Sequence, residues 1–212
     1  MARILLTALG LSLGTPLFVS SAATAQSLDR ILAVVSGHVI MLSDIRAFLE
    51  LGLIDVDPTA ADAEQVALER LIERRLVLDE VDRYRVPPPP PAQIERGVAE
   101  LRLRSSRPDA FTAMLDRLGL ATDDLRQILG DEARREAYLV ERFGGSSELT
   151  ERQLREYYEE RAAELTLDGR PLTFDEARGA LREQLVDRRR RALVADWVEG
   201  LLRRGQVVRF GR

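Results

Sequence analysis

The stretch Ile31-Leu-Ala-Val-Val-Ser-Gly-His-Val-Ile-Met-Leu42 decides how this chain folds. It holds two apolar, β-branched runs on either side of Ser36-Gly37. A two-residue turn of this kind needs positive φ, which glycine adopts without strain, so the stretch predicts a tight antiparallel hairpin. Ser43 is then expected to cap a helix that has Asp44 in its first turn, where a carboxylate meets the positive end of the helix dipole.

A second segment with strand character lies near the end of the sequence, at Gln206-Val-Val-Arg-Phe210. A lone short strand would leave its backbone hydrogen-bonding groups unpaired. The hairpin is the only other source of strands that the sequence indicates. We therefore expect the C-terminal strand to pair with the N-terminal hairpin and to close one domain from both ends of the chain.

Between these segments the pattern is helical. Apolar residues recur at helical spacing between charged ones at Leu68, Leu71, Ile72, Leu76 and Val81, which predicts a long helix. This helix is expected to end by Val86 because prolines follow it. Capping boxes place two later helix starts at Thr150 with Gln153 and at Thr173 with Glu176. Other helices are expected over about 92–104, from Pro108 to a Gly119 stop, from a Thr122 cap to Gly144-Gly145, and from 174 to near Gly205. The predicted fold class is mainly α, a multi-helix core with a small antiparallel β-cluster formed by the hairpin and the C-terminal strand.

Residues 1–25 have the composition of an export signal. Arg3 precedes an apolar run from Ile4 to Val19, and Ala23-Thr24-Ala25 offers the small residues of a cleavage site. A membrane anchor is the competing interpretation, but the run is shorter than the roughly 20 apolar residues that span a bilayer. We expect cleavage after Ala25 and a soluble periplasmic protein.

The composition narrows the classes of function. The 212 residues include no cysteine, which excludes disulfides and thiolate metal centres, and the net charge of −4 does not suggest a nucleic-acid partner. Residues 26–212 are long enough to bury one ordinary core, so a single domain is expected.

No catalytic pattern is found. His38 is the only histidine and lies beside the hairpin turn without a second ligand nearby in sequence, so we interpret it as an ordinary strand residue. There is no Gly-x-Ser-x-Gly elbow and no glycine-rich phosphate loop, and acid pairs such as Glu159-Glu160 are interpreted as solvated charge. The sequence predicts a protein that is not an enzyme and that has no metal, nucleotide or other cofactor.

Two charged or unusual runs remain. Pro87–Pro91 could dock into an aromatic-lined groove of a partner, but a stiff spacer between helices is the preferred interpretation. Arg188–Arg191 could bind an anionic surface, but a solvated helix face moderated by nearby acids is preferred.

Four segments of the chain are specific enough to compare with a known family. The first is the hairpin followed by Ser43-Asp44, and the second is the helix-turn-helix containing Phe111, Leu115, Gly119, Leu120, Leu125, Arg126 and Ile128. The other two are Leu149–Tyr158, and Thr173–Arg178 with Leu181 and Leu185 followed by Val207–Phe210. In this order they resemble SurA-type periplasmic chaperones, the first being similar to the start of that family and the second to its N-terminal domain.

The chain also departs from the family pattern. Ser36 stands where members usually have asparagine, and they rarely have a proline run like Pro87–Pro91. The largest departure lies between Glu164 and Pro171, where too few residues are present for the parvulin prolyl-isomerase domain. We expect a single SurA-like domain over 26–212, with an N-terminal part at 26–164 completed by 171–212, and no parvulin domain.

The resemblance implies an ATP-independent holdase that binds unfolded outer-membrane protein precursors. The alternatives are a non-catalytic structural subunit of an envelope complex and, less favoured, a peptidyl-prolyl isomerase. Phe111, Met114 and Leu118 are the candidate client-binding residues because they share one face of a short helix, although burial in the core is the preferred interpretation of that face. A homodimer formed by segment exchange is a further expectation.

Overall fold

The computed structural model describes residues 29–57, 59–105, 107–145, 149–162, 164–167 and 170–211. In this part of the chain seven helices and five short strands follow one another, and the predicted fold class is confirmed. The expected signal segment, residues 1–25, lies outside the described residues. The elements are β1 (Ile31–Val35), β2 (His38–Met41), α1 (Leu42–Glu50), α2 (Ala63–Arg83), α3 (Pro91–Arg104), α4 (Pro108–Leu118), α5 (Thr122–Phe143), α6 (Glu151–Arg161), β3 (Thr166–Leu167), β4 (Arg170–Pro171), α7 (Phe174–Arg204) and β5 (Val207–Arg209).

The two ends of the described chain meet in one antiparallel sheet of order β2-β1-β5. Val34 of β1 lies opposite both Val39 of β2 and Val208 of β5. The turn between β1 and β2 has φ 49° at Ser36 and 86° at Gly37, the left-handed values that a tight hairpin of this type requires. The prediction that the C-terminal strand completes the hairpin is confirmed.

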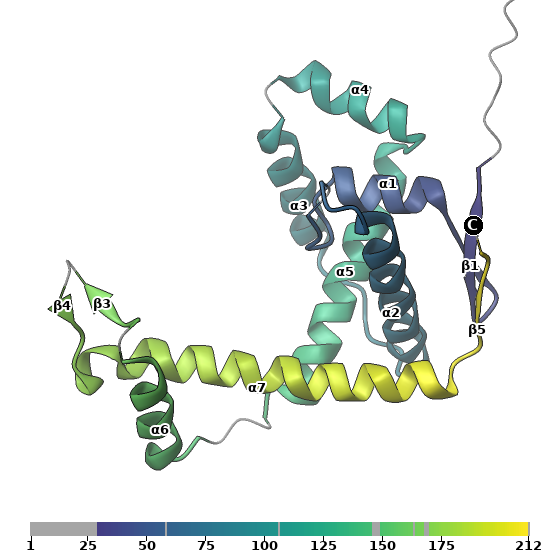
Figure 1. The fold of residues 1–212 in the computed structure, drawn as a ribbon. Coiled ribbons are helices and arrows are strands. Elements are labelled where there is room, and N and C mark those ends of the chain that lie inside the picture. Colours follow the sequence, from purple (N-terminus) through teal and green to yellow (C-terminus); the bar gives the residue numbers. More distant parts are fainter. Residues whose placement is uncertain are drawn as a thin grey trace, which may run out of the picture.

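Helix α7 joins two parts of the molecule (Figure 1). Its 31 residues correspond to a length of about 46 Å. At its C-terminal end α2 and α5 cross it beside the sheet, and together with α1, α3 and α4 they make up what we call the body. At its N-terminal end α6 and the β3–β4 hairpin pack on it and form what we call the small lobe.

The body has two hydrophobic clusters. The larger one joins the sheet to α1, α2, α5 and α7, and Ala33, Val35 and Ile72 are fully buried in it. The smaller one lies among α3, α4 and the start of α5, around Phe111 and Leu125. Because the larger cluster includes residues of both β1 and α7, the C-terminal helix is an integral part of the body.

The small lobe has its own core. Leu154 and Tyr157 of α6 are buried against Ala177 and Leu181 of α7. The Tyr158 hydroxyl donates to the backbone oxygen of Leu172 at 2.7 Å, which ties the segment after β4 to α6. No residue of this core belongs to either cluster of the body.

Two helix starts were predicted correctly. Thr150 Oγ1 accepts from the amide of Gln153 at 3.3 Å, and Thr173 Oγ1 accepts from the amide of Glu176 at 3.4 Å. In each case the longer side chain reaches back to the capping residue's own amide, at 3.0 and 2.9 Å. Both are therefore full capping boxes.

Two other predicted caps were wrong. Ser43 and Thr122 lie inside the first turns of α1 and α5, and the N-cap positions belong to Met41 and Ala121. The reason is that an acid three residues after each N-cap accepts the cap's own amide hydrogen, Asp44 and Asp124 each at 2.8 Å. A carboxylate at this position makes a hydroxyl at the cap unnecessary. The Ser43 hydroxyl instead donates to the carboxylate of Asp29.

Among the described helices, none has an apolar stretch long enough to cross a bilayer.

Candidate functional site: a groove between three helices

A groove of about 630 Å³ lies where α7 meets α2 and α5. Its apolar lining consists chiefly of Leu139 on α5 and of Val194, Val198 and Leu202 on α7. The three α7 residues are four positions apart and therefore share one face of the helix. Leu139 and Val198 belong to the larger cluster of the body, and the other two pack against it. The apolar lining of the groove is therefore part of the outer surface of the larger cluster of the body.

The rim of the groove is charged, with both signs present. The charged lining residues are Arg70, Glu73, Arg135, Glu136, Arg190, Arg191, Asp196 and Glu199. Several are already paired, as Arg190 is with Glu136 at 3.4 Å and Arg70 is with Glu73 at 3.0 Å. Arg191 and Asp196 make no ion pair with any residue that the structure describes. A rim of this kind does not favour ligands of one charge.

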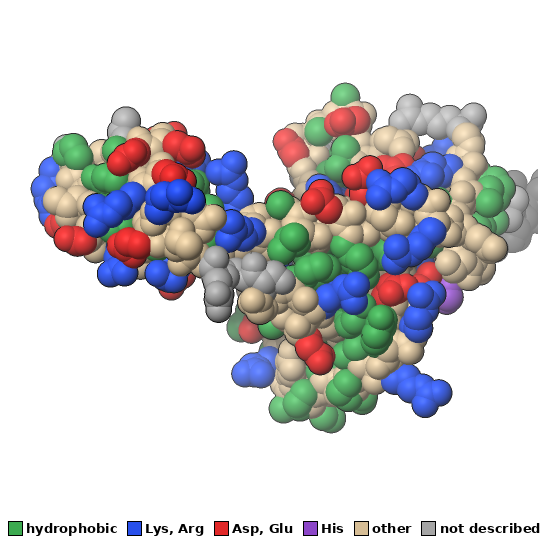
Figure 2. Space-filling view, turned by 90° about the horizontal axis from the view of Figure 1, so that it is seen from below, with side chains coloured by type: hydrophobic (Ala, Val, Ile, Leu, Met, Phe, Trp, Pro, Cys, Tyr) green, Lys and Arg blue, Asp and Glu red, His purple; other side chains and the backbone are tan. Residues whose placement is uncertain are grey.

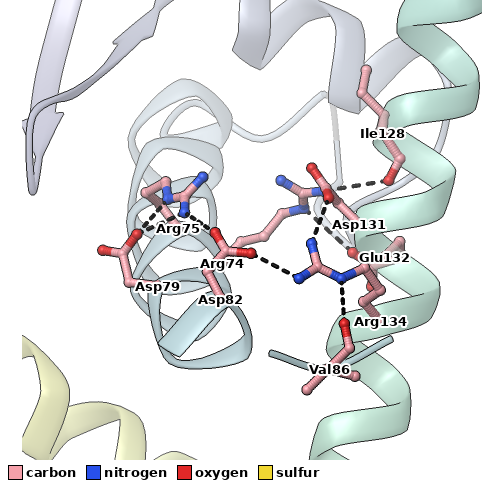
Figure 3. A network of polar contacts seen from close by, with 9 residues as sticks. All are labelled: Arg74, Arg75, Asp79, Asp82, Val86, Ile128, Asp131, Glu132 and Arg134. Atoms are coloured by element: carbon pink, nitrogen blue, oxygen red, sulfur yellow. Dashed lines mark hydrogen bonds and ion pairs between the residues drawn. The ribbon is translucent and has the colours of Figure 1, made fainter. Parts of the chain in front are cut away.

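The helices on two sides of the groove are held together by a polar network (Figure 3). Arg74 on α2 places its Nε 3.3 Å from Oε2 of Glu132 on α5 and donates from Nη2 to the backbone oxygen of Ile128 at 3.4 Å. Arg75, next along α2, donates to Asp79 on its own helix at 2.8 Å. Arginine suits such sites because its planar group makes several directed hydrogen bonds at once.

Arg134 makes the reciprocal connection from α5 to α2 (Figure 3). Its Nη2 lies 2.8 Å from Oδ1 of Asp82, and its Nε donates to the backbone oxygen of Val86 at 3.2 Å. The network therefore fixes the C-terminal end of α2, and the segment that follows it, against α5.

Burial changes the pKa values in this network. Burial lowers the pKa of Arg74, although Glu132 and Asp131 partly offset the effect. Burial acts to raise the pKa of Glu132, but the hydrogen bonds and positive charges of Arg135 and Arg74 outweigh it and hold this pKa below its ordinary value. Glu132 is therefore charged at neutral pH, and we interpret the network as a clamp between helices and not as a proton-transfer site.

Aromatic rings also connect α5 to α7, and two of them, Tyr138 and Trp197, directly precede the groove residues Leu139 and Val198 in the sequence. Tyr138 and Phe143 of α5 lie 5.9 and 5.5 Å, between ring centroids, from Trp197 of α7. The guanidinium of Arg142 stands 5.1 Å from the centre of the Trp197 ring. Contacts of this kind add to the area that the rings bury. These contacts hold α7 against α5, the two helices that supply the apolar lining of the groove.

The client-binding residues predicted from the sequence do not line this groove. Phe111 on α4 is only 2% exposed and belongs to the smaller cluster of the body. Met114 and Leu118 are half-buried and pack against the same cluster. The structure brings the three residues together on one face of α4, and this face is turned toward the core.

Other candidates from the sequence lie on the surface. His38 is exposed on β2. Arg190 pairs with Glu136, and Arg188 lies over the Tyr157 ring with 5.9 Å between its guanidinium carbon and the ring centre. Within the described residues, no group of three or more histidine, cysteine or acidic side chains could hold a metal ion.

Sequence reasoning missed the groove itself. One apolar stripe of α7 runs through Leu193, Trp197 and Leu201, of which Leu201 is buried while Leu193 is 36% exposed. The groove uses the adjacent stripe of Val194, Val198 and Leu202. The sequence signal that could have indicated the groove is the presence of two apolar stripes on this helix, since a helix that packs on one side needs only one apolar stripe.

The space-filling view from below shows how differently the two parts of the molecule are covered (Figure 2). Hydrophobic side chains gather on the body in this view, whereas basic and acidic side chains are interspersed over the small lobe. The apolar groove therefore belongs to the part of the molecule that presents the most apolar surface on this face.

No protein-family model matches the sequence, and a search of curated proteins finds no similar chain.

Proposed function

We propose that the protein is an ATP-independent chaperone that binds unfolded segments of exported proteins, with outer-membrane protein precursors as its clients. The observation that carries this proposal is the groove between α2, α5 and α7, in which an apolar lining is surrounded by charges of both signs. An unfolded chain offers apolar side chains flanked by variable charges, which is the kind of ligand that such a groove accepts.

The expected binding is reversible and modest. Burying one large apolar side chain contributes about 1.5–3 kcal/mol, and the ordering of an unfolded segment offsets much of what several such contacts supply. A groove of 630 Å³ has room for a few side chains of a client and not for a folded domain. Release then needs no nucleotide, in agreement with a sequence that has no glycine-rich phosphate loop.

The place of action in this proposal is the periplasm. It is supported by the composition of residues 1–25, with an apolar run and a small-residue cleavage pattern. The resemblance of the hairpin and of three later segments to SurA-type chaperones supplies the client class.

The first test is suppression of aggregation. An outer-membrane β-barrel protein is unfolded in urea and diluted into the chain without residues 1–25, in the absence of ATP, and light scattering is followed. We expect scattering to fall as the chain is brought to a molar excess. Unchanged scattering at that excess would contradict the proposal and favour the alternative of a structural subunit that docks permanently in one envelope complex.

The second test places the activity in the groove. Ala195 is an exposed residue of α7 that lines the groove, so Ala195→Trp fills the groove without disturbing the core. Ala180 is exposed on the same helix in the small lobe, which makes Ala180→Trp a matched control. We expect the first variant to need about tenfold more protein for the same suppression, equivalent to about 1.4 kcal/mol of binding free energy, and the control to behave as the parent.

The enzyme alternative has its own assay. A protease-coupled measurement on a proline-containing tetrapeptide reports cis–trans isomerisation directly. Acceleration above the uncatalysed rate by the purified chain would establish a prolyl isomerase in place of, or beside, the chaperone. Because isomerisation without a catalyst takes tens to hundreds of seconds, even weak activity is measurable.

A further inference from the structure

The run of prolines after α2 forms an exposed ridge on the body. A polyproline II helix repeats every three residues, so residues three apart lie on the same edge. The exposure of residues 86–91 follows this three-residue period: one residue in three is half-buried and the other two are exposed. The half-buried residues are Val86 and Pro89, and the exposed ones are Pro87, Pro88, Pro90 and Pro91. Pro90 has φ −56° and ψ 137°, which are polyproline II values.

The inner edge of the ridge is fixed to the body. Val86 packs against the larger cluster, its amide donates to the backbone oxygen of Val81 at 3.1 Å, and its own oxygen accepts from Nε of Arg134 at 3.2 Å. Pro88 and Pro89 also border a shallow groove of about 450 Å³ against α5. The ridge is therefore held in the extended form before any partner arrives, which lowers the entropic cost of binding.

The outer edge has unused hydrogen-bond acceptors. Proline has no amide hydrogen, so the run offers oxygens alone. Among the described residues, none donates a hydrogen bond to the backbone oxygens of Pro87 or Pro88. A partner that brings hydrogen-bond donors between apolar contacts would satisfy these oxygens.

A positive charge stands at the N-terminal end of the ridge. Arg85 is exposed, has φ 53°, and makes no ion pair with another described residue. Arg83, the cation that precedes it along the chain, pairs instead with Glu80 at 2.8 Å, and Arg134 pairs with Asp82. Arg85 itself is in the left-handed region, so the polyproline period begins after it, and the free cation stands beside the N-terminal end of the ridge.

We propose that Arg85 and the ridge Pro87–Pro91 form a docking site for a protein module whose groove is lined by aromatic side chains and flanked by carboxylates. Aromatic-lined grooves recognise proline pairs three residues apart on a preformed polyproline helix, and here Pro87–Pro90 and Pro88–Pro91 are both exposed. The carboxylates are the complement of Arg85. The ridge shares no residue with the groove between α2, α5 and α7, so this docking is independent of the proposed chaperone activity.

The sequence alone favoured a spacer, and the structure gives the run both roles. Its half-buried edge connects α2 to α3 along α5, and its exposed edge is free for a partner. A pure spacer would need neither the unpaired cation nor the regular outward prolines.

The test uses the chain without residues 1–25 and, as probe, a purified SH3 domain whose aromatic groove binds two prolines at a three-residue interval and has carboxylates beside it. The ¹⁵N-labelled domain is titrated with the chain and followed by NMR. We expect saturable shifts confined to the aromatic groove of the domain. A synthetic peptide covering 83–93 serves as reference, and binding by the peptide without binding by the folded chain would overturn the proposal, because the fold would then block the ridge.

Single substitutions distinguish the outer edge from the inner one. Pro88→Ala removes an outward proline and is expected to weaken binding about tenfold, the effect of losing one such apolar contact. Pro89→Ala changes the same residue type at the half-buried position and is expected to leave affinity within about twofold, a change that moves the binding free energy by less than about 0.5 kcal/mol. Equal effects of the two would refute the assignment of the edges.

The cation is tested with Arg85→Asn, since asparagine tolerates positive φ and removes only the charge and the length. We expect weaker binding, and a smaller loss of affinity on raising the salt concentration than the parent shows. Binding that is unchanged in strength and in salt dependence would remove Arg85 and the carboxylates from the proposal. Circular dichroism of each variant checks that its helices are intact.

Discussion

Replacing Leu181 by alanine is expected to open the small lobe while the body stays folded. Leu181 is fully buried, and among the described residues the core of the lobe contains three other buried ones, Leu154, Tyr157 and Ala177, with half-buried apolar residues packed around them. None of these four belongs to the clusters of the body. A loss of packing at Leu181 therefore acts first on this small core.

The magnitude follows from the atoms removed. Leucine to alanine deletes three carbon atoms, which at about 0.8 kcal/mol for each buried methylene amounts to about 2.4 kcal/mol. The cavity that remains adds to this, so we expect the free energy of opening the lobe to fall by about 3 kcal/mol. That decrease corresponds to an opening equilibrium about 100-fold more favourable.

Hydrogen exchange followed by mass spectrometry measures this change locally. Peptides from α6 and from the N-terminal half of α7 are expected to exchange about 100-fold faster in Leu181→Ala than in the parent, and peptides from α2 are expected to be unchanged. Leu193→Ala, on the same helix but 36% exposed, is the control and is expected to leave both regions as they were.

Two results would refute this reasoning. Equal acceleration in α2 and α6 would mean that the body and the lobe unfold as one cooperative unit. Unchanged exchange in α6 would mean that Leu181 does not contribute to the packing of α6 on α7.

Three further predictions concern the ion pairs and the sheet. Arg134→Met removes the ion pair with Asp82, which is half exposed, and one hydrogen bond to a backbone oxygen. We expect the free energy of unfolding measured in urea to fall by about 1–2 kcal/mol. An unchanged midpoint would show that the network does not stabilise the fold. The hydrogen bond from Arg170 and then those from the Thr173 cap lower the pKa of Glu176 from 4.5 to about 2. Their contribution to the lobe is therefore complete above about pH 4.5 and is lost as the pH falls toward 2; acid titration followed by tyrosine fluorescence should show this loss, and Glu176→Gln should abolish it. Ending the chain at Gly205 removes β5, its backbone hydrogen bonds to β1 and the burial of its first valine. We expect the melting temperature measured by calorimetry to fall by about 10 °C. An unchanged melting temperature would show that the strand pairing contributes little to stability.

Much of the fold could be predicted because the decisive signals are local or are forced by backbone hydrogen bonding. Ser36-Gly37 specifies the hairpin turn by its dihedral angles, and among the strands expected from the sequence the one at 207–209 had only the hairpin to pair with. The short β3–β4 pair was not expected. The capping boxes at Thr150 and Thr173 were also read correctly because both of their partners lie within four residues.

The errors at Ser43 and Thr122 arose from a competition that the sequence does not rank. In both places a hydroxyl residue and an acid occur within the same four residues, and the acid determines where the helix begins. A charged acceptor makes a stronger hydrogen bond to an amide than a hydroxyl does, which explains the direction of both errors.

The groove could not be predicted, because it depends on how three helices cross. Leu139 and Val198 lie far apart in sequence and become neighbours only when α7 packs on α5, against which it is held partly by Trp197 and Tyr138. Phe111 illustrates the reverse case, since an apolar helix face gives the same pattern whether it meets a ligand or the core.

The pairing of β1 with β5 also determines when the molecule can become whole. A ribosome releases β1 before β5, so the central strand must wait with one edge bare until the helices between them have emerged. Such late closure between distant segments slows folding and leaves the edge open to foreign strands in the meantime. A chain interrupted before β5 is thus marked as unfinished by its own unpaired backbone, where a protease could recognise it.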